Sequence, residues 1–374
     1  MGVNAISVQI QTSKPAEAVR RIASNLSRIT KPAGIVGFAS GASSSRLHAL
    51  AELIRDELPG LPALFTTSDG VFTEHGESED QDGLACLLLG GKSLNIAVGQ
   101  QDTLSSTQAA AVGTSSGPKM FLGSSQAGPP NWHEDSPEPA FAWFGAVTSS
   151  DAPLWGVTAN GEVQSGCCAV VQFPALEPPL LVASPCCRLI TPPTRVSSAE
   201  GATVFELDGV PALVALGQAS SKLVDRSWIV VALSADPNCV PSTNDGSPNL
   251  MFRPVRGIDP ARGAILLTEP VTAGTQLAFA VRDDRAARRS LEDALRYAKQ
   301  RLRGAAPRFG IYFDGLGRGR SLYGAANVDL GLVKHALGEF PLLGMRSAFE
   351  LRGDVRRAAT QTLTGQLALF SNPS

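Results

Sequence analysis

The residues with the clearest chemical potential lie near the C-terminal end of the chain, in residues 309–324. A largely apolar run there leads into a loop that carries Gly315, Gly317 and Gly319, with Arg318 between two of the glycines. Glycine allows positive φ and a close approach of the backbone to another group. The guanidinium of arginine is a rigid fork of donors that suits a carboxylate or a phosphate. A strand that ends in such a loop could hold a small anion with backbone N–H groups and one cation.

This loop and several other segments resemble one family. The loop is similar to the Gly-Arg-Gly signature of the FIST family, and the other similar segments follow in the family's order: residues 204–213, 252–256, 271–283, 337–344 and 362–370. Each segment alone is a weak match, but their joint order is specific. The resemblance covers most of the chain from about residue 33 and is strongest over 180–370. It implies a FIST-N domain over residues 1–177 and a FIST-C domain over residues 178–374.

The resemblance also implies a function. FIST domains are intracellular signal-transduction domains, so we expect a cytoplasmic sensory module that binds a small anionic or zwitterionic ligand, such as an amino acid. A first alternative is a substrate receptor of a ubiquitin ligase, because eukaryotic relatives join this module to an F-box. We expect no F-box here, since the first strand begins by about residue 5. A second alternative is an enzyme, although the sequence offers no adequate Ser/His/Asp, Cys/His or metal constellation.

The resemblance, together with side-chain chemistry, predicts a set of ligand-binding residues: Gly315, Gly317, Arg318, Gly319, Arg282, Asp283, Arg346 and Glu350. We expect Arg318 to be the leading cation and to support a ligand rather than the fold. Gly317 is expected to turn the backbone through positive φ. A purely structural role for the glycines, as a tight turn between strand and helix, stays open. Asp283 or Asp284 could equally cap the long helix that follows.

The chain departs from the family pattern at two positions. Gly315 stands where the family commonly has cysteine, and Phe349 stands where it usually has glycine. A thiol-dependent property of relatives is therefore not expected at this loop.

Composition excludes several classes of protein. The chain has 374 residues, which suggests two or more domains, and its 43% hydrophobic and 18% charged residues are ordinary for a globular protein. A net charge of −2, from 32 basic and 34 acidic residues, offers no electrostatic footprint for nucleic acid or for an acidic membrane surface. The expected partners are a small molecule and another protein, and neither nucleic acid nor a membrane is expected.

The N-terminus predicts neither secretion nor lipidation. It lacks the charged and apolar regions of a secretory signal. Gly2 invites a myristoylation motif, but Ile6 occupies the position where that motif has Ser or Thr. No apolar run approaches the roughly 20 residues that a membrane span requires.

Six cysteines are present, at positions 86, 167, 168, 186, 187 and 239. The two adjacent pairs lack the Cys-x-x-Cys type of spacing of a zinc site. We therefore expect reduced, buried, structural thiols and no bound metal.

Hydrophobic spacing predicts a mixed α/β fold, with mixed sheets flanked by helices. In the first half, strands are expected at 5–10, 34–39, 62–67, 83–89, 94–99, 141–147, 154–158 and 167–173, and helices at 15–26 and, capped by serine, at 43–58. Residues 69–77 could line a site or form a turn. Residues 101–140 predict a long surface excursion, part of it mobile, with a short apolar core at 120–122. Asn160-Gly161 predicts a hairpin turn.

The second half repeats this alternation after a boundary near residues 175–180. Strands are expected at 180–190, 202–207, 228–234, 263–268, 275–282, 308–313 and 364–370, and helices at 210–217, 285–302 and 327–337. The helix at 285–302 has the clearest apolar face.

Three short motifs mimic known sites, and each fails in its context. Residues 89–93 resemble the end of a phosphate-binding loop, but Cys86 replaces the required glycine, so a hairpin turn is expected. Residues 113–117 have the spacing of a nucleophile elbow but are followed at once by proline. Residues 315–320 lack the third glycine of a dinucleotide fingerprint. No cofactor is therefore expected.

Overall fold

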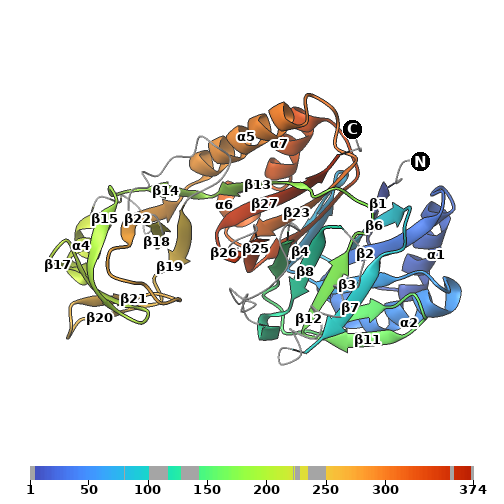
Figure 1. Cartoon of the computed structure of the whole chain (residues 1–374), viewed down its shortest axis with the longest axis horizontal. Coiled ribbons are helices and arrows are strands. Elements are labelled where there is room, and N and C mark those ends of the chain that lie inside the picture. Colours follow the sequence, from blue (N-terminus) through green and yellow to red (C-terminus); the bar gives the residue numbers. More distant parts are fainter. Residues whose placement is uncertain are drawn as a thin grey trace.

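The structure of the chain, a computed structural model, describes residues 5–79, 81–100, 117–127, 143–221, 223, 228–234, 250–353 and 358–371. Figure 1 shows three parts along the longest axis of the molecule. The N-terminal strands and helices lie at one end, sheets that include the C-terminal strands lie in the middle, and a lobe built mostly of strands lies at the other end. We call this lobe, which consists of the described residues between 187 and 282, the outer lobe.

Sheet 1 belongs to the N-terminal end. Its order is β1 (Ala5–Ile10), β6 (Gly83–Gly90), β2 (Pro32–Ser40), β3 (Ala63–Thr67), β10 (Leu154–Val157) and β11 (Val163–Gly166). Two helices, α1 (Pro15–Leu26) and α2 (Leu47–Glu57), pack on one face through apolar residues spaced three and four apart, such as Val19 with Ile22 and Leu50 with Ile54. Proline at the first position of α1 favours the start of that helix.

Sheets 2 and 3 each combine strands from both halves of the chain. Sheet 2 has the order β13 (Leu180–Pro185), β27 (Thr364–Phe370), β23 (Phe309–Gly315), β24 (Leu342–Ser347), β4 (Gly70–Thr73) and β5 (Gly76–Glu79). Sheet 3 has the order β26 (Ala358–Gln361), β25 (Phe349–Gly353), β9 (Trp143–Val147), β8 (Lys119–Gly123), β12 (Cys168–Gln172) and β7 (Asn95–Gly99). The expected domain boundary near 175–180 falls between β12 and β13, yet strand pairing crosses it.

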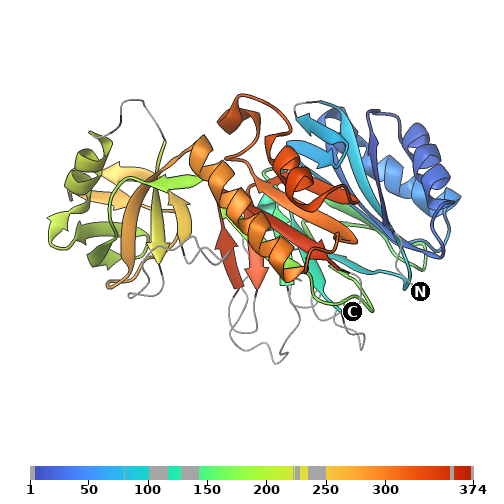
Figure 2. The same cartoon turned by 90° about the horizontal axis from the view of Figure 1, so that it is seen from above.

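The main core fills the space between sheet 1 and sheets 2 and 3. It contains Phe38 of β2, Phe144 of β9 and Phe313 of β23, whose ring centroids lie 6.2 Å (Phe38–Phe313) and 6.3 Å (Phe144–Phe313) apart. The opposite face of sheet 2 is covered by α5 (Asp284–Arg301) and α7 (Val328–Leu337), as Figure 2 shows from above for α5. The strand β23 is consequently buried on both faces, which explains its nearly continuous apolar sequence.

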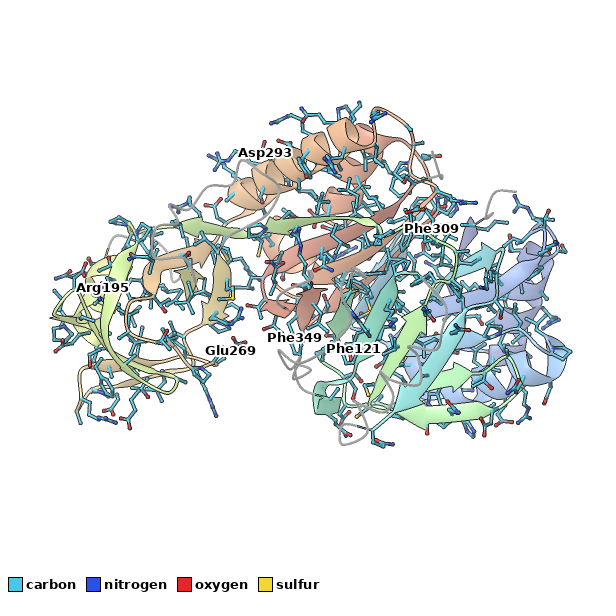
Figure 3. All side chains as sticks on the ribbon, viewed as in Figure 1. Phe121, Arg195, Glu269, Asp293, Phe309 and Phe349 are labelled. Carbon is cyan, nitrogen blue, oxygen red and sulfur yellow. The ribbon has the colours of Figure 1, made fainter. Side chains whose placement is uncertain are left out.

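The outer lobe lies between β13 and α5 in the sequence. Its strands are β14 (Cys187–Leu189), β15 (Thr194–Glu200), β16 (Thr203–Leu207), β17 (Val210–Pro211), β18 (Ile229–Ser234), β19 (Met251–Pro254), β20 (Gly257–Asp259), β21 (Ala264–Leu266) and β22 (Gln276–Arg282), with the helix α4 (Ala212–Ser220). Buried Arg253 of β19 donates to the carbonyl oxygen of Thr360 in β26 (2.9 Å) and pairs with Glu269 (2.8 Å). Figure 3 places Glu269 on the side of the lobe that faces sheet 3. The bond from Arg253 to Thr360 joins the lobe to the middle of the molecule.

The structure confirms the mixed α/β fold and most of the expected elements. The helices expected at 15–26 and 327–337, and the long helix expected at 285–302, appear within one residue of their expected limits. Strands not expected from the sequence include β15, β19, β20, β24, β25 and β26. Apart from β24, which is buried throughout, these strands are short or lie in polar segments, where alternation of residue types is a weak signal.

Three expectations about local structure are wrong in part. The helix expected at 43–58 begins only at Leu47, because a 3₁₀ helix, η1 (Gly41–Arg46), precedes it and no serine caps it. Residues 89–93 do not form a hairpin turn, since they connect β6 in sheet 1 to β7 in sheet 3. The Asn160-Gly161 turn does close a hairpin, but its second strand is β11 rather than residues 167–173.

Residues 69–77 and 101–140 have different outcomes. Residues 70–79 form the hairpin of β4 and β5, which pairs with β24 of the second half. The apolar core expected at 120–122 is the buried strand β8, and a second 3₁₀ helix, η3 (Ser125–Ala127), follows it. The rest of the predicted excursion and most of the 113–117 motif lie outside the described residues. In the described part of the chain, no helix is both long and apolar enough to cross a membrane.

Candidate ligand site at the carboxyl ends of β23 and β24

The candidate site lies where two parallel strands end. The strands β23 and β24 are paired in parallel, and Asp314 and Arg346 are register partners at their carboxyl ends. The loop after β23 leads into the short helix α6 (Arg320–Tyr323) and then into α7. Ligands of open α/β sheets commonly bind outside the carboxyl ends of the strands. The topology therefore brings charged side chains to an edge that is suited to binding.

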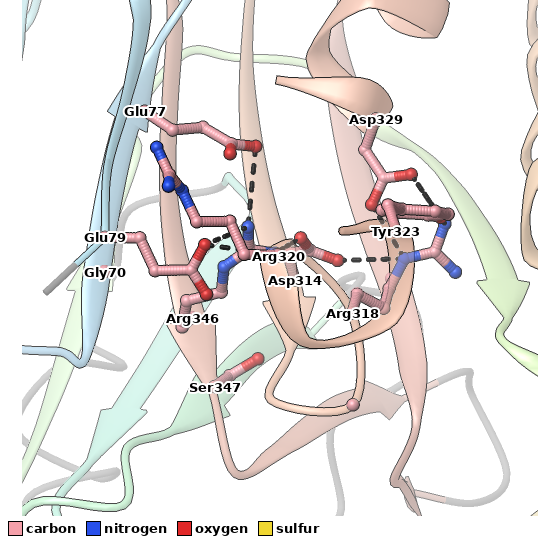
Figure 4. Close-up of polar contacts among 12 residues, drawn as sticks. Gly70, Glu77, Glu79, Asp314, Arg318, Arg320, Tyr323, Asp329, Arg346 and Ser347 are labelled. Atoms are coloured by element: carbon pink, nitrogen blue, oxygen red, sulfur yellow. Dashed lines mark hydrogen bonds and ion pairs between the residues drawn. The ribbon is translucent and has the colours of Figure 1, made fainter. Parts of the chain in front are cut away.

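Arg318 is buried in a network of hydrogen bonds, with 1% of its surface exposed. Its Nε and Nη2 donate to the two carboxylate oxygens of Asp329, each at 2.9 Å. Nη1 donates to the carbonyl oxygen of Ser184 (2.8 Å), and Nη2 also donates to the hydroxyl of Tyr323 (3.0 Å). Nε lies 3.0 Å from Oδ1 of Asp314 as well (Figure 4). The guanidinium is thus held on several sides by the protein itself.

The electrostatics of Arg318 agree with this geometry. Burial alone would lower the pKa of the guanidinium, because it disfavours the charged form. Attraction to Asp329 and the hydrogen bonds between the two groups outweigh burial and raise the pKa of Arg318 well above its ordinary value. Burial also raises the pKa of the Tyr323 phenol, so this hydroxyl stays protonated and donates to Asp329. Arg318 and Asp329 therefore form a tightly held ion pair.

Arg346 is also buried, and it connects the two halves of the chain. Its Nη1 contacts the carboxylate of Asp314. Its Nη2 lies 3.5 Å from Oε1 of Glu77 and 3.8 Å from Oε2 of Glu79, both on β5 of the first half (Figure 4). Glu79 also accepts a hydrogen bond from the backbone N–H of Arg320 (3.2 Å). The hairpin of β4 and β5 is therefore tied to the loop after β23.

Asp314 lies between the two arginines, so all these groups form one unit. We call it the ionic cluster; its members are Arg318, Arg346, Asp314, Asp329, Glu77 and Glu79. Two guanidinium groups face four carboxylates, an excess of two negative charges if all are ionised. Burial raises the pKa of Glu77, although attraction to Arg346 opposes this rise. The cluster thus has a deficit of positive charge within its own residues.

Glu350 of β25 is a fully buried carboxyl group next to the loop. Its Oε1 accepts a hydrogen bond from the hydroxyl of Ser347 (2.7 Å), and its Oε2 makes no hydrogen bond within the described residues. A Cβ atom on Gly315 would lie 3.2 Å from Oε1, so glycine allows this close approach. Burial raises the pKa of Glu350 well above its ordinary value, and the Ser347 hydrogen bond only partly opposes it.

Comparison with known families assigns the chain. The FIST N domain model matches residues 34–210, and the FIST C domain model matches residues 219–351. The chain belongs to the FIST family. These matches confirm the resemblance seen in the sequence. FIST domains are sensory domains of signal transduction.

Curated relatives of this FIST chain come from mycobacteria. It is 34% identical over 196 residues to uncharacterized protein MT0656 and to uncharacterized protein Rv0628c, from two strains of Mycobacterium tuberculosis. It is 31% identical over 192 residues to uncharacterized protein Mb0898c of Mycobacterium bovis. Each of these matches covers 50% of this chain and 50% of the relative. The chain therefore spans about half the length of the curated relatives it matches.

The structure changes the expected role of residues 315–319, the glycine-rich loop at the end of β23, which we call the FIST loop. The sequence predicts that Arg318 supports a ligand rather than the fold, but in the structure its guanidinium nitrogens donate to protein groups. Gly317 does not have positive φ; a Cβ there would lie 2.4 Å from Cδ2 of Leu363, so close packing requires glycine. Gly319 does have positive φ (69°), and a Cβ there would lie 2.4 Å from Nη2 of Arg346. A ligand-binding role for these residues stays a prediction.

Arg282 and Asp283, at the end of β22, have separate roles in the structure. Arg282 donates to the carbonyl oxygens of Gly317 (3.4 Å) and Ser321 (3.0 Å), so it holds the FIST loop from the side of the outer lobe. Asp283 accepts a hydrogen bond from the backbone N–H of Ala286 (2.8 Å) and pairs with Arg188 (2.8 Å). Capping of α5 by Asp283, one of the two alternatives left open by the sequence, is confirmed.

Sequence reasoning missed Asp314, Asp329 and Glu79, and it left open whether the segment that contains Glu77 lines a site. Asp314 carried a usable signal, because it is a charged residue within an otherwise apolar buried strand. Glu77 and Glu79 were part of, or next to, a polar segment interpreted mainly as a turn. Asp329 gave no local signal, since an acidic residue in the first turn of a helix is ordinary.

The buried Glu350 gives a testable pH dependence. Because its folded pKa is raised, the folded state binds more protons than the unfolded state above about pH 4, and stability falls as pH rises by about 1.4 kcal/mol per unit in the interval between the two pKa values. Glu350→Gln removes this term, so the variant should gain stability relative to the natural chain between pH 5 and pH 8. Urea unfolding at both pH values measures the difference, and a difference independent of pH would show that Glu350 is ionised in the fold.

Proposed function

We propose that this FIST chain is a sensory module that binds a small ligand with an ammonium group, such as a zwitterionic amino acid, at the ionic cluster. The observation that carries the proposal is the excess of carboxylates in a largely buried cluster. Buried charges are normally paired, because an unpaired charge loses its hydration without compensation. A ligand ammonium beside Glu77 and Glu79 would supply the missing positive charge.

Two further observations support the position of the ligand. Nη2 of Arg346 is buried and makes no hydrogen bond to any residue that the structure describes, although two carboxylates lie within 4 Å. The cluster also reaches the surface, because the side chain of Glu79 is 17% exposed and Arg320 is exposed. A zwitterion could place its ammonium near Glu79 and its carboxylate near Arg320.

The proposed site suggests how binding produces a signal. The hairpin of β4 and β5 comes from the first half, and the loop after β23 comes from the second. A ligand that contacts both would stabilise their association by its differential affinity for the joined state. We propose further that a protein partner recognises the state in which the hairpin and the loop are joined, and so transmits the signal. The roles in a ubiquitin ligase or as an enzyme stay predictions.

A thermal-shift screen of the purified chain against amino acids and nucleotides tests the proposal. A ligand at 100 times its dissociation constant should stabilise the fold by about 2.7 kcal/mol. Glu79→Gln should weaken this shift, because it removes a negative charge at the accessible end of the cluster. Glu200→Gln is the matched control, since that side chain is 81% exposed on the outer lobe.

Two results would overturn the proposal. One is an equal ligand-induced shift in the natural chain, in Glu79→Gln and in Glu200→Gln, which would place the ligand elsewhere. The other is the lack of a shift with every amino acid, which would exclude the proposed ligand class.

A further inference from the structure

Two adjacent cysteines lie where the outer lobe joins the middle of the molecule. Sheet 2 strand β13 ends at Pro185, Cys186 follows, and β14 of the outer lobe begins at Cys187. Both cysteines carry free thiols. Cys186 is fully buried, whereas Cys187 is partly exposed. One member of the pair is therefore accessible to a small reagent, and the other lies directly behind it in the sequence.

Cys186 contacts the loop of the candidate site and two neighbouring elements of the fold. Its Sγ lies 3.7 Å from the carbonyl oxygen of Gly317, in the loop that carries Arg318. Its backbone N–H donates to the carbonyl oxygen of Leu363, just before β27 (2.8 Å). Its carbonyl oxygen accepts from the backbone N–H of Asp283, the residue that caps α5 (3.0 Å). A change in geometry at Cys186 would therefore alter its contacts with the loop, with the residue before β27 and with the start of α5.

The two thiols also interact with each other and with arginines. A hydrogen bond from the Cys187 thiol is the main cause that lowers the pKa of Cys186, and Arg318 and Arg282 lower it further against the effect of burial. The same hydrogen bond is the main cause that raises the pKa of Cys187. Negative charge in this pair is therefore favoured on Cys186 rather than on Cys187. By contrast, burial raises the pKa of Cys168, in the other adjacent pair, to about 12.

We propose that Cys186 and Cys187 form a reversible oxidation site, in which hydrogen peroxide converts the two thiols to a disulfide. The sulfur of Cys187, the exposed member of the pair, attacks one oxygen of the peroxide while its proton passes to the Cys186 thiolate; the O–O bond breaks, hydroxide leaves with a proton from solvent as water, and a sulfenic acid remains on Cys187. The sulfur of Cys186 then attacks the sulfur of Cys187, the S–O bond breaks, and hydroxide leaves with the Cys186 proton as a second water. The thiols lose two electrons, and the peroxide is reduced to two waters.

Adjacency makes such a disulfide labile. The Cα atoms of neighbouring residues are about 3.8 Å apart, whereas disulfides usually join Cα atoms about 4.4–6.8 Å apart. Strain raises the reduction potential, so cellular dithiols can reduce the bond again. Closing the bond must also reorient the backbone at Cys186, which weakens its hydrogen bonds to Leu363 and Asp283. Oxidation is thereby coupled to the loop of the candidate site.

Peptide mapping of the full chain after treatment with hydrogen peroxide tests the proposal. The peptide that holds both cysteines should lose the mass of two hydrogen atoms and regain it with dithiothreitol. The adjacent pair Cys167 and Cys168 is the control within the same molecule, because both of its thiols are buried. We expect oxidation of the 186–187 pair to be at least ten-fold faster.

Single variants separate this reaction from other thiol chemistry. In Cys186→Ser, peroxide should leave a sulfenic acid on Cys187 that a dimedone probe traps, whereas the natural chain should show little trapping. A disulfide from either cysteine to Cys239, equal oxidation rates for the two adjacent pairs, or no loss of hydrogen at 186–187 would each overturn the proposal. Because this readout is the mass of one peptide, its result does not depend on any ligand of the ionic cluster.

Discussion

Arg318→Ala should lower the free energy of unfolding by about 3–5 kcal/mol, the usual cost of breaking a buried ion pair. The reason is the position of the partners. Removal of the guanidinium leaves the carboxylates of Asp329 and Asp314 buried, and it leaves the carbonyl oxygen of Ser184 without its donor. Urea unfolding of the unliganded chain measures the loss.

The matched control for Arg318 is Arg296→Ala on α5. The Arg296 side chain is 67% exposed, and its partner Asp293 lies on the outer side of the helix in Figure 3. An exposed pair of this kind typically contributes about 0–1 kcal/mol. If Arg318→Ala proves as stable as the control, the contacts of Arg318 do not hold the fold, and the expectation from the sequence that it serves a ligand is restored.

Arg346→Met should cost about 3 kcal/mol or more, and the cost should depend on pH. The change leaves Asp314, Glu77 and Glu79 near one another without their shared cation. Burial already raises the pKa of Glu77, and the loss of the attraction to Arg346 raises it further above its unfolded value of about 4. Stability is therefore present at low pH and is lost as pH rises, so the deficit should be smaller at pH 5 than at pH 8.

Urea unfolding of Arg346→Met and of the natural chain at the two pH values tests this prediction, with Arg296→Met as the exposed control. Arg346 also lies over the ring of Phe72, 5.8 Å from its centroid. A deficit of the same size at both pH values would assign the loss to this contact and to packing rather than to the carboxylates.

Local patterns in the sequence predicted the helices and the apolar strands. The apolar spacing of residues 15–26 and 285–302 specifies α1 and α5, because a helix turns every 3.6 residues and must bury one face. The apolar run before the glycine loop specifies a strand that is covered on both sides. The order of the short segments also specified the FIST family, which the domain models confirm.

Pairing between distant segments could not be predicted in the same way. Residues 69–77 look like a turn because they are polar and contain glycine, yet they form a hairpin that pairs with β24. Strand pairing depends on backbone hydrogen-bonding groups and on which edge of a sheet is unpaired, and local composition specifies neither. The same holds for β25, which pairs with β9 from the other half.

The sequence by itself determined which residue types are present at the candidate site: the glycines, the two arginines and Glu350. Only the tertiary structure decided what each of them contacts. Arg318 looks available for a ligand until Asp329, Asp314 and Ser184 are placed around it. The free energy of a buried charge depends on the groups that surround it in space, and these come from segments as far apart as Ser184 and Asp329.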